Sequence, residues 1–146
     1  MSKKNNIAYS PAGKFEETRF EKIHNVIFED SKQASIEVAN EIASLIKIKA
    51  SENKPCVLGL ATGSTPIKVY EELIRLHNEE GLSFQNVISF NLDEYYPMNP
   101  EDIQSYYYFM HEYLFKHVDI LPENINIPDG SLQGTDLHQY CIDYEL

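Results

Sequence analysis

Short apolar segments alternate along this chain with segments whose apolar residues recur at helical spacing. Cys56–Leu60 is a short, continuous apolar run, and residues 86–91 (NVISFN) are interpreted as a second strand of the buried type. Residues 32–50, 67–80 and 106–117 carry apolar residues three and four positions apart. Continuous apolarity is typical of strands buried on both faces of a parallel sheet. The order strand, helix, strand, helix therefore predicts an α/β fold with a mostly parallel sheet and helices on both faces.

The expected element bounds follow from capping residues. The helix over 32–50 should begin at Ser31 as its N-cap, and the helix before Gly81 should begin at Pro66 with Thr65 as its N-cap. The third helix should begin near Ser105 or Asp102. We expect its buried stripe to contain six residues, namely Tyr106, Phe109, Met110, Tyr113, Leu114 and His117. A short strand or extended loop is expected near 125–127, and a last helix from about residue 135.

A length of 146 residues predicts one domain. Residues 1–30 are polar and without a sustained period, so we interpret them as an N-terminal extension with a short strand possible at 24–28. Residues 31–146 form the expected domain. The last helix has no stop signal before residue 146, so the domain is expected to be truncated.

The distribution of charge excludes several functions. Residues 1–75 carry 11 basic and 10 acidic side chains, whereas residues 76–146 carry 13 acidic side chains and Lys116 as their one base. Nucleic acids and anionic membranes need clustered Lys and Arg, so neither is an expected partner. No apolar run reaches the ~20 residues that span a bilayer. The N-terminus is not of the secretory type, and two cysteines make no disulfide framework, which predicts a cytoplasmic location.

The first candidate site is the loop between the first expected strand and the helix after it. Gly63 permits a backbone turn that a side chain would obstruct, and free N–H groups at the start of a helix favour an anion. The loop lacks the P-loop lysine and the dinucleotide-binding glycine pattern. Phosphate binding by Thr62, Gly63, Ser64 and Thr65 is one interpretation, and an ordinary capped turn is the other.

The second candidate is the pair Asp93 and Glu94, directly after the second strand. Ligands of open α/β sheets lie beyond the carboxyl ends of the strands. One of the two carboxylates would face a ligand there and act as a general base on carbon next to a carbonyl. A solvated loop acid or a helix-capping acid is the alternative.

Other chemically suggestive residues fit structural roles. Tyr106 and Tyr113 are expected in the helix core, His77 in a satisfied core position, and Cys56 as an inert buried thiol. His111 and His117 are six residues apart on one helix, which is not a metal-ligand spacing. No metal site is predicted.

Four segments together resemble the glucosamine-6-phosphate deaminases. They are LGLATGSTP (58–66), SFNLDEYY (89–96), SYYYFMHEYLFKHVDI (105–120) and PENINIPDG (122–130). The resemblance implies a Rossmann-like three-layer α/β/α fold, with the sugar phosphate held by Thr62–Thr65. It further implies that Asp93 is the base at sugar C2 and that Glu94 supports it.

The implied reaction converts glucosamine 6-phosphate and water to fructose 6-phosphate and ammonia without a cofactor. Related 6-phosphogluconolactonases share the Gly-Ser-Thr-Pro loop but typically have Arg where Tyr95 stands here. Family members continue for about another hundred residues, which carry a second catalytic Asp, a ring-opening His, a supporting Glu and the Arg and Lys that close on phosphate.

Three hypotheses remain. The chain is the N-terminal part of a deaminase with at most feeble activity alone, a sugar-phosphate-binding module without turnover, or part of a lactonase. We also expect it to form a homo-oligomer, because an uncovered sheet edge favours association.

Overall fold

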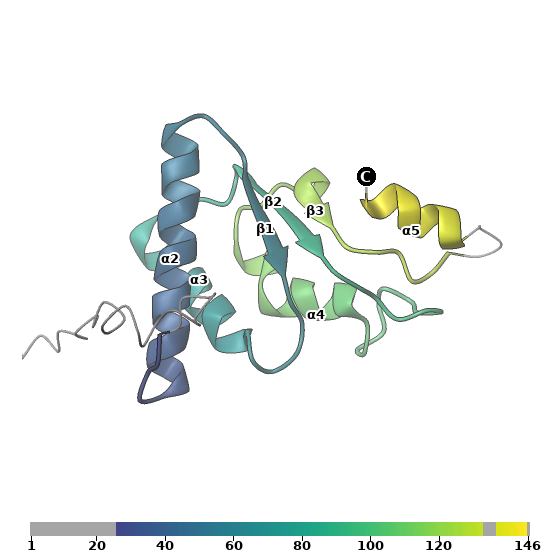
Figure 1. Ribbon diagram of the computed structural model, residues 1–146, viewed down its shortest axis with the longest axis horizontal. Coiled ribbons are helices and arrows are strands. Elements are labelled where there is room, and N and C mark those ends of the chain that lie inside the picture. Colours follow the sequence, from purple (N-terminus) through teal and green to yellow (C-terminus); the bar gives the residue numbers. More distant parts are fainter. Residues whose placement is uncertain (1–25, 133–136, 146) are drawn as a thin grey trace, which may run out of the picture.

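The computed structural model describes residues 26–132 and 137–145. Three strands form one sheet in the order β1 (Cys56–Leu60), β2 (Val87–Asn91), β3 (Ile125–Asn126), and both pairings are parallel (Figure 1). This confirms the predicted parallel α/β sheet, including the short strand near residue 125.

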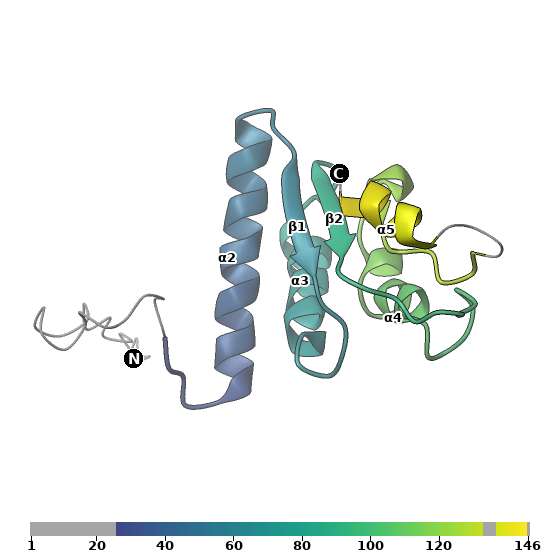
Figure 2. The same ribbon diagram turned by 45° about the vertical axis from the view of Figure 1, so that its right-hand side comes forward.

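Helices lie on both faces of this sheet. Helix α2 (Ser31–Ser51) and α3 (Ile67–Glu80) pack against each other, and α3 also contacts α4 (Tyr106–Tyr113). The short 3₁₀ helices η1 (Phe115–His117) and η2 (Pro122–Asn124) connect α4 to β3. Helix α5 (Leu137–Glu145) lies on the opposite face from α3, where Tyr144 contacts the ring of Phe90 (Figure 2). The arrangement is the expected three-layer α/β/α.

One apolar core holds α2, α3 and α4 against the sheet. Alternate residues of β1 and β2 point into it, among them Cys56, Leu58 and Val87. The helices contribute the buried side chains Ala39, Ala43, Ile46, Tyr70, Leu73, Leu76, Met110 and Leu114. Burial of each large apolar side chain contributes about 1.5–3 kcal/mol, so this cluster stabilises the packing of the three helices on the sheet.

Two predicted helix starts are wrong in detail. Asp30, not Ser31, caps α2: its carboxylate accepts the N–H groups of Lys32 and Gln33, both at 2.8 Å, and a carboxylate there also complements the helix dipole. Helix α3 begins at Ile67 with Pro66, not Thr65, as its N-cap: the Pro66 carbonyl accepts the Tyr70 N–H at 3.0 Å, and no side chain caps the helix.

The third helix is shorter than expected. Helix α4 ends at Tyr113, because Leu114 leaves helical geometry at φ −145°, and a 3₁₀ turn follows. Ser105 caps its N-terminus, which confirms the first of the two predicted positions, Ser105 and Asp102. Met110 and Leu114 are buried as predicted, but Tyr113 is 42% exposed, so its expected place in the core is wrong.

The expectation that β1 is buried on both faces is also wrong for the described residues. Val57 is 59% exposed and Gly59 is exposed, because α5 covers the sheet only near β2 and β3. No strand forms at residues 26–28, and the rest of the possible N-terminal strand lies outside the described residues. Among the described helices, none combines the length and apolarity that crossing a membrane requires.

Candidate functional site at the carboxyl edge of the sheet

The ends of β1 and β2 lie side by side. Leu60 pairs with Asn91, and the Asn91 side-chain amide donates to the Leu60 carbonyl at 3.0 Å. The segments that follow, residues 61–66 (the glycine loop) and residues 92–105 (the acidic loop), therefore leave the sheet from one edge. Gly63 and Asp93 lie on the same side of the molecule, as the sequence predicts.

The glycine loop needs its glycine for conformation rather than for space. Gly63 has φ +100°, a backbone conformation that L-residues rarely adopt, yet a Cβ there would meet nothing within 4 Å. The sequence predicted both the glycine and its turn, and the positive φ confirms that a side chain would be strained there. The turn carries the exposed residues Ser64 and Thr65 away from the sheet edge.

A buried tyrosine fixes the start of this loop. Tyr70, in the second turn of α3, donates its hydroxyl to the Ala61 carbonyl at 2.5 Å. Burial raises the pKa of Tyr70 to about 12, although the hydrogen bond to Ala61 acts in the opposite direction. The phenol therefore stays a donor throughout the physiological pH range and holds β1 to α3.

The N–H groups of the glycine loop are free to bind a ligand. Those of Gly63, Ser64 and Thr65 have no hydrogen-bond acceptor among the residues that the structure describes. They stand at the N-terminus of α3, where the helix dipole favours negative charge. This geometry suits an anion such as a phosphate.

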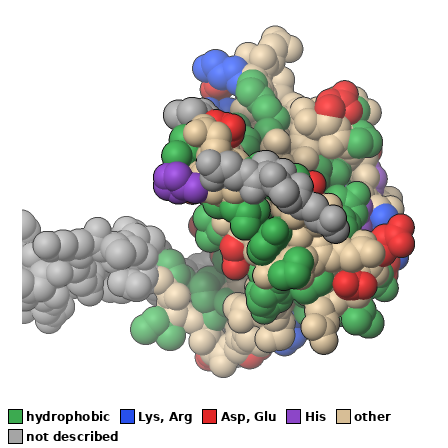
Figure 3. Space-filling model, turned by 90° about the vertical axis from the view of Figure 1, so that its right-hand side faces the viewer, with side chains coloured by type: hydrophobic (Ala, Val, Ile, Leu, Met, Phe, Trp, Pro, Cys, Tyr) green, Lys and Arg blue, Asp and Glu red, His purple; other side chains and the backbone are tan. Residues whose placement is uncertain are grey.

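The basic side chains of α3 and η1 are engaged with other groups. Lys68 donates to the Ser31 hydroxyl on α2 at 2.9 Å, and Arg75 pairs with Glu72, Glu79 and Glu80. Lys116 pairs with Glu112. On the side shown in Figure 3, acidic side chains are spread over the surface and the basic ones lie at its margins. Within the described residues, an anion at the glycine loop would be held by backbone groups and hydroxyls.

The two acids of the acidic loop have different surroundings. Asp93 is exposed, and Glu94 is half-buried. The Glu94 carboxylate accepts four hydrogen bonds, from the backbone N–H groups of Tyr95, Tyr106 and Tyr107 and from the Ser105 hydroxyl. Of the pair, Asp93 is therefore the carboxylate available to a ligand, and Glu94 is a helix-capping acid.

Sequence reasoning missed Tyr106, which was expected in the core. Its hydroxyl donates to the Tyr95 hydroxyl at 3.2 Å, and the two rings lie 4.9 Å apart. The hydrogen bond with Tyr95 raises the pKa of Tyr106, the Thr62 side chain lowers it, and the charge of Asp93 raises it. Tyr106 thus lies close to both loops. The helical spacing of Tyr106 predicted a buried position, whereas the first turn of α4 lies at the edge of the sheet.

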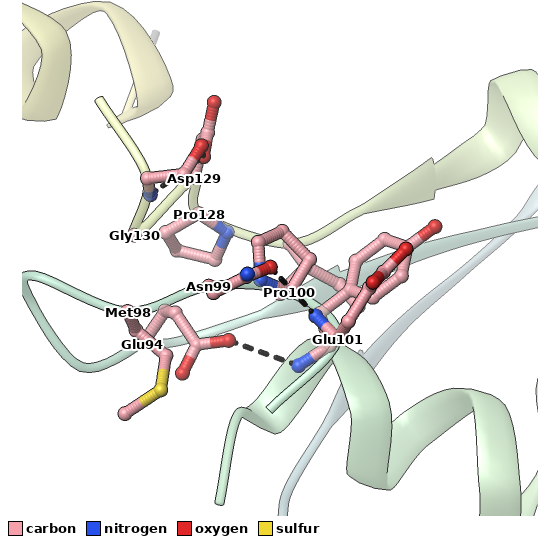
Figure 4. A pocket seen from close by; sticks show the side chains of 11 residues that line it. Glu94, Met98, Asn99, Pro100, Glu101, Pro128, Asp129 and Gly130 are labelled. Carbon is pink, nitrogen blue, oxygen red and sulfur yellow. Dashed lines mark hydrogen bonds between the residues drawn. The ribbon is translucent and has the colours of Figure 1, made fainter. Parts of the chain in front are cut away.

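A cavity of about 650 Å³ lies beside the acidic loop (Figure 4). Glu94, Met98 and Tyr107 line one part of it, and residues 127–131 line another. It includes neither Asp93 nor any residue of the glycine loop. Across residues 26–132 and 137–145, no group of three or more His, Cys, Asp and Glu is placed to hold a metal ion.

A parallel α/β sheet with an open glycine loop and an acid at adjacent strand ends defines a class of small-ligand sites. The family model for glucosamine-6-phosphate isomerases and 6-phosphogluconolactonases matches residues 29–145. The chain therefore belongs to this family, as the four sequence segments indicated.

Curated relatives lie on the deaminase side of the family. A glucosamine-6-phosphate deaminase-like protein of Bacteroides thetaiotaomicron is 44% identical over 94% of this chain and 21% of its own length. Glucosamine-6-phosphate deaminase 2 of Giardia intestinalis is 50% identical over 79% of this chain and 41% of its own. The chain spans less than half the length of these relatives.

Two solved structures share the fold of this chain. A monomeric glucosamine-6-phosphate deaminase superposes with a TM-score of 0.74 at 41% identity, covering 81% of this chain and 46% of its own. The 6-phosphogluconolactonase of Thermotoga maritima superposes with a TM-score of 0.64 at 24% identity, over 82% of this chain and 50% of its own, which supports the shared fold.

Proposed function

We propose that this chain supplies half of the site of a glucosamine-6-phosphate deaminase. The observation that carries the proposal is the register of β1 and β2, which pairs Leu60 with Asn91 and so sets the glycine loop beside Asp93. Phosphate binds to the N–H groups and hydroxyls of Thr62, Gly63, Ser64 and Thr65, and the sugar extends from there toward Asp93. The lactonase alternative has weaker support, because the Bacteroides, Giardia and monomeric proteins, all above 40% identity, are named deaminases or deaminase-like.

The chemistry follows from the position of an exposed carboxylate near an open-chain amino sugar. Asp93 takes the proton from C2, which is acidic because it lies beside the C1 aldehyde, and returns it to C1, while the C1 oxygen gains a proton and the C2 amine loses one. The product is a ketose imine at C2. Water adds to this carbon and ammonia leaves, giving fructose 6-phosphate. The hydrolytic step thus releases the amine, and no cofactor is required.

Residues 31–146 are, in this proposal, the N-terminal part of the deaminase domain, and residues 1–30 precede it. Ring opening and cationic contacts to the phosphate belong to the portion that the longer relatives have. The 146-residue chain alone therefore has feeble deaminase activity at most. Ammonia release at a rate normal for a deaminase by the pure chain would contradict this.

The test of Asp93 uses a chimera in which residues 1–146 are followed by the remaining part of the Treponema denticola deaminase, which is 47% identical over the shared region. The chimera should release ammonia from glucosamine 6-phosphate. Because a general base contributes about 10²–10⁴-fold, Asp93→Asn should lower kcat by at least about 10²-fold and leave phosphate binding intact. The matched control is Asp102→Asn, an exposed acid of the same loop. Unchanged turnover in Asp93→Asn would contradict the role of Asp93.

The non-catalytic binding module remains the second hypothesis, and calorimetry separates it from the first. A half-site binds glucosamine 6-phosphate poorly, with a Kd in the millimolar range or weaker, that is, about −4 kcal/mol. A natural binding module would bind it tightly without any further chain. Micromolar affinity for the 146-residue chain would favour the module.

We also infer a homo-oligomer in the cytoplasm. Exposed Val57 and the partly exposed Phe90 form an apolar sheet face that another copy would cover, and the two cysteines are unpaired. Sedimentation velocity should show concentration-dependent association that Val57→Lys weakens. A monomer at all concentrations would contradict the oligomer, and export of the tagged chain would contradict the location.

A further inference from the structure

The Glu94 carboxylate connects the acidic loop to the first turn of α4. One oxygen accepts the N–H groups of Tyr95 at 2.9 Å and Tyr106 at 3.0 Å. The other accepts the Ser105 hydroxyl at 2.8 Å and the Tyr107 N–H at 2.9 Å. Three backbone N–H groups and one hydroxyl, from two separate segments, thus converge on one side chain.

All four bonds can form together only if the side chain is a carboxylate. A carboxylate accepts on both oxygens, whereas a glutamine amide presents a donor on one side, toward an N–H group that is also a donor. Two of the N–H groups belong to the start of α4, where the helix dipole attracts a negative group. Charge and geometry therefore act together to keep Glu94 in one position.

The opposite side of Glu94 is packed against residue 130. A Cβ on Gly130 would lie 3.1 Å from the Glu94 Cγ and would overlap the Tyr95 carbonyl oxygen. The acidic loop therefore packs directly against the backbone of Gly130. The Met98 N–H donates to the Gly130 carbonyl at 2.8 Å. Glu94 is thus held between α4 and residue 130, while Asp93, one residue earlier, has no hydrogen-bond partner within the described residues.

We propose that Glu94 is a positioning residue, whose four hydrogen bonds to the acidic loop and the first turn of α4 aim the neighbouring Asp93 carboxylate at the ligand held by the glycine loop. Glu94 does not touch the ligand. It acts through the backbone of residues 93–95. The ligand part of this inference rests on the proposed function, whereas the restraint of the loop does not.

The first measurement concerns the free 146-residue chain. Amide hydrogen exchange at Tyr95, Tyr106 and Tyr107, whose N–H groups donate to Glu94, should accelerate at least about 10-fold in Glu94→Gln and stay unchanged in α2 and β1. Glu101→Gln, an exposed acid of the same loop, should leave all these rates within about 2-fold. Ser105→Ala removes one of the four donors and also the N-cap of α4, so Tyr95, which does not depend on that cap, is the amide to compare. Its exchange should accelerate by a smaller factor, which keeps the test decisive if Glu94→Gln folds poorly. Unchanged exchange at Tyr95 in both variants would overturn the proposal.

The second measurement separates positioning from general loosening. NMR titrations compare glucosamine 6-phosphate, which reaches both loops, with inorganic phosphate, which needs only the glycine loop. Glu94→Gln should weaken binding of the sugar phosphate by at least about 5-fold and change phosphate binding by less than about 2-fold, as Asp93→Asn should do. An equal loss for both ligands, or no loss for either, would overturn the proposal. If the wild type binds neither ligand, the proposed function fails and the exchange measurement alone decides the role of Glu94.

Discussion

The glycine loop and the acidic loop leave the same edge of the sheet but are held in different ways. The glycine loop is fixed at its first residue by Tyr70 and turns on Gly63, and its N–H groups have no acceptor within the described chain. The acidic loop is held at two places: Glu94 accepts hydrogen bonds from the start of α4, and the loop backbone at Tyr95 packs closely against Gly130. One loop is thus built by local conformation and is open to a ligand, and the other depends on contacts with distant segments.

Gly130→Ala should have the largest effect, and it should act on the acidic loop. The new Cβ would overlap the Tyr95 carbonyl oxygen, so backbone must move, and overpacking of this kind costs about 1–3 kcal/mol. Urea unfolding measures the loss. Gly59→Ala is the matched control, because a Cβ there meets nothing within 4 Å. Equal stability of Gly130→Ala and the wild type would show that the loop is not braced by residue 130.

Gly63→Ala should have a smaller effect on stability and a clear effect on the glycine loop. Its cost is conformational, about 1–2 kcal/mol for an L-residue at φ +100°. Inorganic phosphate, followed by the amide signals of Ser64 and Thr65, should bind at least several-fold more weakly. Gly59→Ala again serves as control. Phosphate affinity equal to that of the wild type would contradict an anion role for this turn.

Tyr70→Phe should have the smallest effect at neutral pH, about 1 kcal/mol for one lost hydrogen bond. The pH dependence gives a sharper test. The folded pKa of about 12 exceeds the ordinary value of 10, so the unfolded chain loses the phenol proton first as the pH rises. The stability that this tyrosine contributes is fully present below pH 10 and is lost between about pH 10 and 12. The difference in urea midpoint between the wild type and Tyr70→Phe should narrow over this pH range. A difference that stays constant would contradict a buried tyrosine donor.

The difference between the loops also explains how far sequence reasoning reached. Strand ends, Gly63 and Gly81 follow from local pattern, and the structure has all of them where the sequence predicted. The contacts of Glu94 do not follow from local pattern, because its partners at the start of α4 lie 11 to 13 residues away. The position of Tyr106 does not follow either, because this residue fits the apolar spacing of a buried stripe. Local signals fix elements and turns. They do not reveal which carboxylate a distant helix start will capture.

The exposure of β1 shows a similar limit. Its five residues are apolar without interruption, and this pattern predicted burial on both faces, yet Val57 is 59% exposed in the described part of the chain. Apolar composition alone therefore does not show that both faces of a strand are covered.

The most direct test of a shared site is one NMR titration of the 146-residue chain with glucosamine 6-phosphate, reading the amides of Gly63 and Ser64 together with those of Asp93 and Tyr95. Both sets of signals should shift along one binding curve with a single, weak Kd, and inorganic phosphate should move the first set alone. Shifts confined to one loop at every concentration of the sugar phosphate, or centred on another part of the molecule, would contradict the joint sugar-phosphate site.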